Sequence, residues 1–347
     1  MRADNYYPSF KGGKLRWYTN NHVTADIPVE GGKIWYVDGD KTGTNSGTSW
    51  EDAFSETQFD GNLSGVSSSI AAGDVIYVAA RTMAVTDTDP ISYTTNLTVN
   101  VPQVSIIGVS RGLTQGGLPQ FKVGATTTQA IIRVRAPGVM IANLGINGAS
   151  ATGGGIRFDD DGGTTYASFA GSVLGCHFKN CKGTTATNAA TGGAVQLSGA
   201  PWQMLIAGNR FYSNVGDVVL LDTSNSAPKD IVIRDNFFSP DASAVDCNIY
   251  GAGGSGFAYV EIDSNVFGQL PAVGSGSIVR YMDLTGADAG MVTRNMFGAL
   301  VSEGSTEVTF EASGTAAKIP TVVHMAGNYG QFETGVGAGL ISGEIFA

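Results

Sequence analysis

The chain has 347 residues, of which 49 are glycine and 14% are charged, and its net charge of −10 corresponds to a pI of about 4.7. This acidic balance argues against a nucleic-acid partner, because a phosphate backbone is bound by clustered lysine and arginine, and no such stripe occurs. No stretch of about eighteen apolar residues is present, so we expect no membrane insertion.

The three cysteines, Cys176, Cys181 and Cys247, are too few and too scattered for a disulfide framework. Such residues are typical of small buried side chains in a protein that is made in a reducing compartment. The first residues lack the continuous apolar core of a secretory signal peptide. We therefore predict a protein that is assembled in a cytoplasm and is not exported by a signal peptide.

Residues 1–33 form a segment whose composition differs from the rest of the chain. Five basic and three acidic residues give it a charge of +2, which leaves −12 for residues 34–347. Aromatic and arginine side chains anchor many protein interfaces, so we interpret the segment as an extended docking arm. The alternative is an arm that folds back on its own chain. Its candidate partner-binding residues are Tyr6, Tyr7, Phe10, Arg16 and Trp17.

Residues 34–73 are expected to hold a first strand and a cap. The apolar run Ile34–Val37 predicts the strand. Ser49 and Asp52 have the spacing of a capping box with Asp in place of Glu, which predicts a short helix near residues 50–59. A helix there would cover one open end of a stacked structure.

Residues 74–330 carry a repeat, in which an apolar strand ends in Asn-x-aromatic or a close variant. The six clearest copies are centred on one equivalent position, with steps of 33, 27, 29, 30 and 33 residues between them. Strand-like units with a period of this size indicate a solenoid. The equivalent positions are Cys176, Asn209, Asn236, Asn265, Asn295 and Asn328.

Stacking of successive turns at strand spacing, about 4.8 Å, would place equivalent side chains in columns. The asparagines are expected to hydrogen-bond along the axis and to adopt the left-handed bend between two strands. A second, aromatic column is expected to point inward. Its members are Phe178, Phe211, Phe238, Phe267 and Phe297.

The runs Trp35–Gly39, Thr48–Phe54 and Ala71–Ala79, together with the Asn-x-Phe repeats, resemble the right-handed parallel β-helix (pectate-lyase-like) superfamily, and most of all its phage virion proteins. The resemblance implies an all-β, single-stranded parallel β-helix with a short N-terminal capping helix and an extended N-terminal arm. The superfamily includes pectate-lyase-like enzymes, phage tailspikes, and phage capsid or tail components without catalysis, so the fold alone does not give the function.

Alternate residues of each repeat strand are expected to face outward, where a solvated sheet should be mostly polar. Four apolar residues instead fall at outward positions, and exposed apolar patches mark interfaces. We therefore predict that this face binds a partner, as a second copy in a homo-oligomer or as another protein, with an intramolecular loop as the alternative cover. The residues are Leu174, Leu205, Val232 and Met291.

The candidate catalytic residues are Asp235, Glu261 and Asp263, with Arg234 one coil away. Paired carboxylates on adjacent coils could serve a glycoside hydrolase, and carboxylates with a basic residue could serve a polysaccharide lyase. The alternative is an inert ion pair between Arg234 and Asp263 on a solvated face.

The other polar motifs predict no metal and no cofactor. The run Asp159–Asp161 could hold Ca²⁺, but it lacks the spacing of an EF-hand and is interpreted as a turn. Asp217 and Asp222 lie five residues apart and are also expected in turns. The three histidines, His22, His177 and His324, form no zinc-binding pattern.

Together with the resemblance, these observations predict a non-enzymatic structural protein of a phage particle, either a capsid decoration or a tail-associated β-helix. Its expected partners are other virion proteins, bound through the arm, and possible surface glycans, bound near Trp202. The alternative is a polysaccharide lyase or glycoside hydrolase of tailspike type. Residues 331–347 are expected to cap the last coil, because an open solenoid end exposes strand edges.

Overall fold

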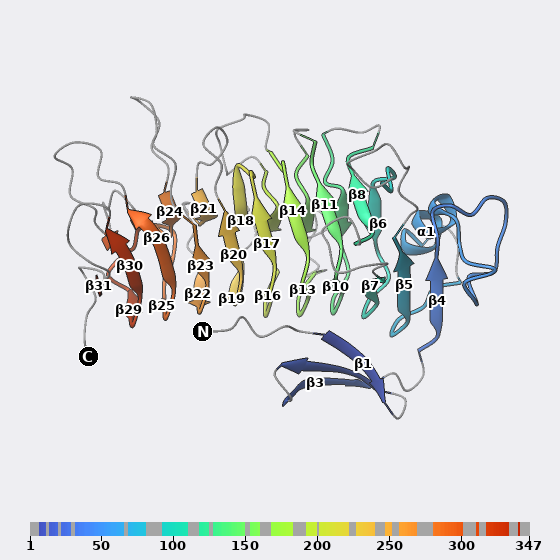
Figure 1. Ribbon diagram of the computed structural model, residues 1–347, viewed down its shortest axis with the longest axis horizontal. Coiled ribbons are helices and arrows are strands. Elements are labelled where there is room, and N and C mark those ends of the chain that lie inside the picture. The colour runs from blue at the N-terminus through green and yellow to red at the C-terminus, as the bar shows by residue number, and fades with distance from the viewer. Residues whose placement is uncertain are drawn as a thin grey trace.

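The computed structural model shows an elongated stack of β-strands (Figure 1). The described part of the chain comprises residues 7–11, 14–19, 22–28, 32–65, 69–80, 92–109, 118–124, 128–149, 153–159, 168–182, 192–199, 201–221, 227–239, 247–251, 257–268, 280–300, 310–311, 317–332 and 339–340.

Three sheets run along the stack. The first sheet consists of β4 (Ile34–Val37), β5 (Val75–Ala79), β7 (Ser105–Val109), β10 (Met140–Ala142), β13 (Ser172–Leu174), β16 (Leu205–Ala207), β19 (Lys229–Arg234), β22 (Ala258–Asp263), β25 (Gly290–Thr293) and β29 (Val323–Ala326). The second consists of β8 (Gln120–Lys122), β11 (Gly145–Asn147), β14 (His177–Lys179), β17 (Arg210–Tyr212), β20 (Phe237–Ser239), β23 (Val266–Phe267), β26 (Met296–Leu300), β30 (Tyr329–Phe332) and β31 (Gly339–Leu340). The third consists of β6 (Leu97–Val99), β9 (Ile132–Val134), β12 (Ile156–Asp159), β15 (Val195–Ser198), β18 (Gly216–Leu221), β21 (Cys247–Tyr250), β24 (Arg280–Asp283), β28 (Ala317–Lys318) and β27 (Phe310–Glu311).

Each coil visits the three sheets in the same order and then returns to the first sheet one coil further along. The strands β10, β11 and β12 make one such coil, and β10 pairs in parallel with β7 on one side and β13 on the other. The predicted all-β parallel β-helix is therefore confirmed. The first predicted strand belongs to it, because β4 pairs in parallel with β5.

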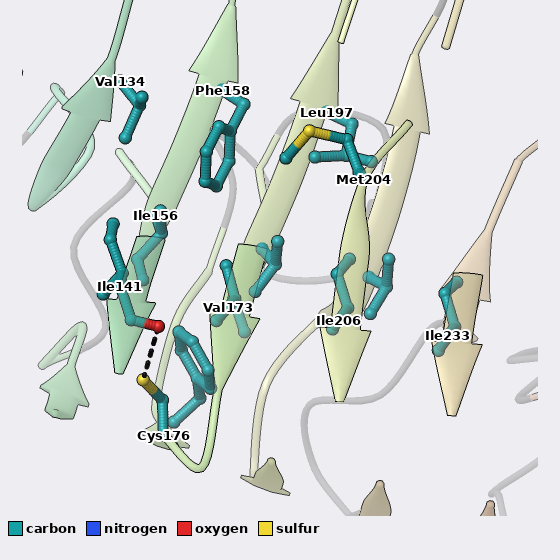
Figure 2. Packing of buried hydrophobic residues seen from close by; sticks show 14 of the residues in the cluster. Val134, Ile141, Ile156, Phe158, Val173, Cys176, Leu197, Met204, Ile206 and Ile233 are labelled. Atoms are coloured by element: carbon teal, nitrogen blue, oxygen red, sulfur yellow. Dashed lines mark hydrogen bonds between the residues drawn. The ribbon is translucent and has the colours of Figure 1, made fainter. Parts of the chain in front are cut away.

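The interior contains the predicted aromatic column. From Phe178 to Phe297, the rings of neighbouring coils stack with centroid separations of 4.7 to 5.0 Å. This distance matches the spacing of hydrogen-bonded strands, about 4.8 Å, as the stacking argument requires. Ile206 and Ile233 of the first sheet are also fully buried and follow one another along the interior (Figure 2). Equivalent side chains thus form one continuous apolar core.

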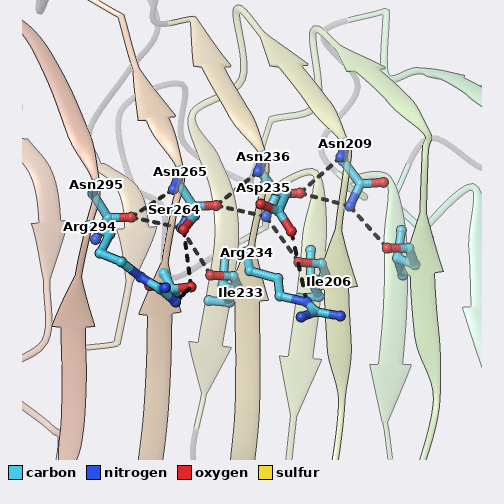
Figure 3. Close-up of polar contacts among 12 residues, drawn as sticks. Ile206, Asn209, Ile233, Arg234, Asp235, Asn236, Ser264, Asn265, Arg294 and Asn295 are labelled. Carbon is cyan, nitrogen blue, oxygen red and sulfur yellow. Dashed lines mark hydrogen bonds and ion pairs between the residues drawn. The ribbon is translucent and has the colours of Figure 1, made fainter. Parts of the chain in front are cut away.

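The predicted asparagine ladder is present at the turn between the first and second sheets (Figure 3). The Oδ1 of Asn236 accepts hydrogen bonds from the backbone N–H and the Nδ2 of Asn209, at 2.9 and 3.0 Å. Asn209 Nδ2 also donates to the carbonyl oxygen of Val173, one coil back. The same three bonds recur at Asn265 and Asn295, and the ladder reaches Asn328.

The left-handed bend was predicted at the asparagine itself, and this prediction was wrong. The positive φ angles lie one residue earlier, with values of 67° at Gly208, 56° at Asp235 and 54° at Arg294. The preceding residue makes the bend, and the asparagine side chain then satisfies backbone groups that the bend removes from the sheets. Asparagine is therefore needed here for its amide hydrogen bonds rather than for its tolerance of a left-handed backbone.

Cys176 occupies the ladder position in its own coil. Its thiol points at the carbonyl oxygen of Ile141, the acceptor that an asparagine would use, over 3.9 Å (Figure 2). All three cysteines are buried, as predicted, and they form no disulfide with one another. Burial raises the pKa of Cys176 and of Cys181 to about 12, so both thiols stay protonated at neutral pH.

A short helix covers the first coil, but its predicted position was too early. The helix α1 spans Glu56–Leu63, and its capping box uses Ser55 and Gln58. Ser49 Oγ instead accepts a hydrogen bond from the Asp52 N–H in a local turn. The second Ser-x-x-polar pattern was therefore the one that starts the helix. Phe59 and Leu63 on its inner side are fully buried in the core.

The N-terminal arm is folded into a sheet of its own rather than a single extended stretch. Its three antiparallel strands are β1 (Tyr7–Lys11), β2 (Lys14–Thr19) and β3 (His22–Pro28). Alternating apolar and polar residues such as those of Lys14–Thr19 favour strands of this kind. Tyr6, and the side chains of Tyr7, Phe10, Arg16 and Trp17, lie outside the described part of the chain.

At the other end, β31 pairs antiparallel with β30, which breaks the parallel pattern. The remaining residues of the predicted C-terminal cap lie outside the described part, so the cap remains a prediction. Within the described residues, no helix is both long enough and apolar enough to cross a bilayer.

Candidate functional site

The predicted catalytic residues meet on the outside of the first sheet, where β19 and β22 run side by side. The strand register places Arg234 beside Asp263 and Val232 beside Glu261. Asp235 follows β19 in the bend that leads to the asparagine ladder (Figure 3). The four residues therefore occupy two adjacent coils, as the repeat predicted.

Asp263 is held by a residue that the sequence analysis did not single out. The Arg294 guanidinium reaches back one coil and donates from Nε to Asp263 Oδ1 at 2.8 Å and from Nη2 to Oδ2 at 2.5 Å. Thr293 Oγ1 donates to Oδ1 at 2.7 Å, and Ser264 Oγ donates to Oδ2 at 3.1 Å. Both carboxylate oxygens thus accept two hydrogen bonds, and only 8% of the side chain is exposed.

The expected ion pair between Arg234 and Asp263 is therefore not the one that forms. Arg234 Nε lies 3.9 Å from Asp235 Oδ2 instead. Arg294 reaches Asp263 because it stands in the left-handed bend, directly before the ladder residue Asn295. The position before each ladder asparagine was the sequence signal that could have identified it.

The electrostatics of this site favour the ionised form of the Asp263 carboxylate at neutral pH. Burial alone would raise the pKa of Asp263, but the hydrogen bonds from Arg294 and Thr293 and the charge of Arg294 outweigh it and lower the pKa below its ordinary value. A general acid needs a proton near neutral pH, so Asp263 is poorly suited to that role. Glu261 is half-buried on the same strand.

The outward apolar residues that were predicted to bind a partner differ in burial along the first sheet. Leu174 is 7% exposed and belongs to a buried cluster on the outside of the sheet, with Leu205 packed against it. Val232 is half-buried, and Met291 is 38% exposed. The cluster consists of Val75, Ile107, Met140, Ala142, Leu174 and Ala207.

A second polar group lies on the outside of the third sheet, where three arginines surround one carboxylate. Asp159 Oδ2 is 2.8 Å from Arg133 Nε and 3.1 Å from Arg157 Nε, and Asp159 Oδ1 is 3.9 Å from Arg135 Nε. Burial raises the pKa of Asp159, which is 3% exposed, while the three guanidinium groups oppose this shift.

Three positive charges against one negative charge leave this arginine cluster with a formal charge of +2, in a chain whose net charge is −10. The side chains of Arg133 and Arg157 are each 42% exposed. The sequence analysis considered Asp159 only as a calcium ligand or turn residue. The alternation of arginines at 133 and 135, and the register that pairs Arg133 with Arg157, were the signal that it missed.

Asp217 is a buried carboxyl group of β18 rather than a solvated turn residue. It is 3% exposed and accepts hydrogen bonds from Asn214 Nδ2 at 2.8 Å and from Asn248 Nδ2 at 2.7 Å. Burial raises its pKa to about 7, against the effect of these two donors. A substrate in solvent cannot reach this group. Asp222 lies outside the described part.

The remaining candidates show no ligand geometry. Trp202 donates from Nε1 to the Ala227 carbonyl oxygen at 3.3 Å, and the Lys229 ammonium lies over its ring, 5.1 Å from the centroid. In the described ranges, no group of three or more histidine, cysteine or acidic residues gathers in a way that could hold a metal. His177 is half-buried and His324 is exposed on different sheets.

Comparison with known proteins gives similarity of fold at low sequence identity. No family model matches the chain, and no curated protein matches it. Among solved structures, pectate lyase Pel9A is 12% identical, with a TM-score of 0.42 over 88% of this chain and 81% of that one. A rhamnogalacturonan lyase is 13% identical, with a TM-score of 0.39 over 91% and 90%. PfbA, a surface adhesin of Streptococcus pneumoniae, is 9% identical, with a TM-score of 0.37 over 78% and 82%.

These neighbours are named as polysaccharide lyases and as a surface adhesin. The parallel strand pairing of this chain confirms the β-helix fold that the resemblance implied. The narrower resemblance to phage virion proteins remains a prediction.

Proposed function

We propose that this chain is a non-enzymatic structural β-helix of a phage particle, displayed on the capsid or tail and attached to other virion proteins through its N-terminal arm. In this proposal the solenoid is a rigid display element, and its outer faces make contacts rather than perform chemistry. The acidic body and the basic, aromatic arm of residues 1–33 fit such a division.

The observation that carries the proposal is that the Asp263 carboxylate already has all of its hydrogen-bonding positions occupied by protein donors. Its two oxygens already accept four hydrogen bonds, from Arg294, Thr293 and Ser264. A carboxylate in this state has no free lone pair directed at a substrate proton, and its lowered pKa leaves it no proton to give. The best sequence candidate for hydrolase or lyase chemistry is therefore organised as a structural ion pair.

Two measurements test the proposal. The purified chain should release neither reducing ends nor unsaturated uronates from a panel of neutral and acidic polysaccharides. Labelled antibody should bind intact phage particles in electron micrographs, on the capsid or the tail. Turnover that disappears in Glu261→Gln or Asp263→Asn, while Asp230→Asn stays active, would establish the lyase or hydrolase alternative instead.

A second candidate function is the binding of an acidic glycan, and the arginine cluster favours it. Arg133, Arg135 and Arg157 share a single carboxylate, so their outward N–H groups can pair with a uronate, phosphate or sulfate group. Binding of this kind needs no catalytic residue and is compatible with a structural role.

A glycan array tests this second function directly. Retention of acidic glycans should fall in the double variant Arg133→Gln and Arg157→Gln, in which Arg135 still accompanies Asp159. Arg234→Gln, on the first sheet, is the matched control and should bind as the unmodified chain does. Equal retention by both variants would remove the arginine cluster from consideration.

A further inference from the structure

A column of exposed side chains runs along the outside of the second sheet, one residue after each ladder position. The strand register aligns Arg210, Phe237, Val266, Met296 and Tyr329 on five consecutive strands. Figure 1 shows these strands, β17, β20, β23, β26 and β30, in one row. We call this set the second-sheet column.

The second-sheet column is unusually apolar for a solvent-facing surface. Phe237 is 44% exposed, Met296 is 52% exposed and Tyr329 is 47% exposed, while the ring at the neighbouring inward position, Phe238, is fully buried. Val266 is half-buried, and Arg210 is exposed. Phenylalanine, tyrosine, methionine and arginine are the residues enriched in protein interfaces, and the column contains no acidic residue.

The second-sheet column of one copy is complementary to the same column of a second copy that runs in the opposite direction. Five strands at about 4.8 Å place Val266 in the middle, with roughly 19 Å between the two ends. Reversal matches Phe237 with Met296, which is a favourable sulfur–aromatic pair. It also matches Arg210 with Tyr329, which is a cation–π pair. The small Val266 meets its own equivalent at the centre.

The flanking column, in the left-handed bends, has matching charges. Asp235 precedes Phe237 by two residues, and Arg294 precedes Met296 by two residues, so they occupy equivalent places on either side of the central coil. The same reversal therefore sets Asp235 of one copy opposite Arg294 of the other. The Arg294 side chain is 65% exposed and the Asp235 side chain 28%. Opposite charges at such positions favour one register over others.

We infer that a second copy of this chain docks on the second-sheet column, about a two-fold axis that passes through Val266 and runs along the strands. The two solenoid axes are then antiparallel. A two-fold axis of this kind pairs each residue with a different residue, except at the axis, where a residue meets its own copy. The flanking column of this interface borders the first-sheet site, where Arg294 also binds Asp263. The interface itself does not include the first-sheet residues Leu174, Leu205, Val232 and Met291.

The first experiment is sedimentation velocity on the full chain over a range of concentrations. We expect a dimer that dissociates on dilution, and we expect Phe237→Glu to be monomeric at all concentrations, because it buries a charge against Met296 of the other copy. Phe169→Glu is the matched control, since Phe169 is an exposed phenylalanine outside the second sheet, and this variant should remain dimeric. A monomeric unmodified chain, a dimer that persists in Phe237→Glu, or loss of the dimer in Phe169→Glu would overturn the inference.

The second experiment locates the axis with a short bismaleimide cross-linker. The three native thiols are buried, so an introduced surface cysteine is the reactive one. Val266→Cys should cross-link to itself, whereas Arg210→Cys should cross-link only when it is mixed with Tyr329→Cys. Self-linking of Arg210→Cys would indicate parallel solenoids and would contradict the two-fold axis. Circular dichroism spectra of each variant establish that the β-fold is retained.

Discussion

The N-terminal and C-terminal halves of the first sheet differ in how far their outward side chains are exposed. Their inward side chains are buried in both halves. In the N-terminal half, Val75, Ile107 and Met140 point outward and yet are 2%, 1% and 5% exposed. In the C-terminal half, Met291 is 38% exposed and His324 is exposed, and the outer surface carries the Arg294–Asp263 ion pair. Met140, Met291 and His324 all occupy the same column of the repeat.

This contrast shows that the repeat constrains the two faces of the sheet unequally. Inward side chains must stack on their equivalents in the next coil, so their identities are fixed by packing. Outward side chains meet whatever covers the coil, and this changes along the axis. Differences in function along a β-helix are therefore expected on its outer columns.

The largest expected effect comes from placing a charge at matched positions in the two halves. Met140→Asp should lower the free energy of unfolding by at least about 3 kcal/mol, because it buries an unpaired carboxylate. His324→Asp, in the same column but exposed, should change it by less than about 0.5 kcal/mol. Urea unfolding followed by circular dichroism measures both. Equal losses in the two variants would show that the outer halves do not differ in burial.

The second prediction concerns the ion pair of the C-terminal half. Asp263→Asn should lower the free energy of unfolding by about 1–3 kcal/mol at pH 7, because charge-assisted hydrogen bonds to Arg294 are lost. The lowered pKa of Asp263 means that its contribution is present at neutral pH and is lost as the pH falls below the ordinary aspartate value, about 3.9.

The difference in the free energy of unfolding between Asp263→Asn and the unmodified chain should therefore become smaller in urea titrations repeated at increasingly acidic pH. Asp230→Asn replaces an exposed carboxylate on the same sheet and serves as the control, with little change expected at any pH. If the difference in the free energy of unfolding stays constant as the pH falls, Asp263 does not stabilise the protein as an ionised partner of Arg294.

The third prediction concerns Asp217, a buried carboxyl group on the third sheet. The pKa of Asp217 is raised to about 7, so the fold favours its protonated form, and the ionised form destabilises the protein as the pH rises from about 3.9 through 7. Asp217→Asn removes this charge and should raise the free energy of unfolding by about 1 kcal/mol at pH 8, with no gain at pH 4. Thermal unfolding at both pH values measures this, and a gain at pH 4 alone would contradict it.

The smallest expected effect lies at Cys176, where the asparagine ladder ends on its N-terminal side. Cys176→Asn supplies an N–H for the Ile141 carbonyl oxygen, which the thiol now approaches at 3.9 Å. We expect a gain of about 0.5 kcal/mol, or about 1 °C in Tm. Cys176→Ala should lower Tm, since it only removes buried atoms. A lower Tm for the asparagine variant would show that the N-terminal coils cannot extend the ladder.

The stacked interior could be predicted from the sequence because it repeats. Phe211 and Asn236 recur with their neighbours at a nearly constant spacing, and strand spacing then fixes their contacts. The start of α1 was misplaced because two Ser-x-x-polar patterns lie within ten residues, and the reciprocal capping box forms at Ser55 and Gln58, whereas Ser49 and Asp52 make a local turn.

The candidate site was predicted only in part. The repeat placed Glu261 and Asp263 on one outer strand, but it could not show which arginine would reach them, because the path of a long side chain depends on the local bend. The arginine cluster around Asp159 was missed for a related reason, since Arg133 and Arg135 lie on one coil, Arg157 and Asp159 lie on the next, and only the strand register brings the two pairs together. Contacts between residues that do not recur in the repeat can be predicted only when the register of neighbouring coils is known.

The asparagine ladder also makes the length of this molecule adjustable in fixed steps. Each rung offers the next coil the same acceptor and the same donors, so duplication of the segment from Phe237 to Asn265 would insert one more coil with both of its neighbours satisfied. Such an insertion would lengthen the rod by about 4.8 Å without a new kind of contact. Duplication of one coil within the gene would therefore change the length of the solenoid by one strand spacing at a time.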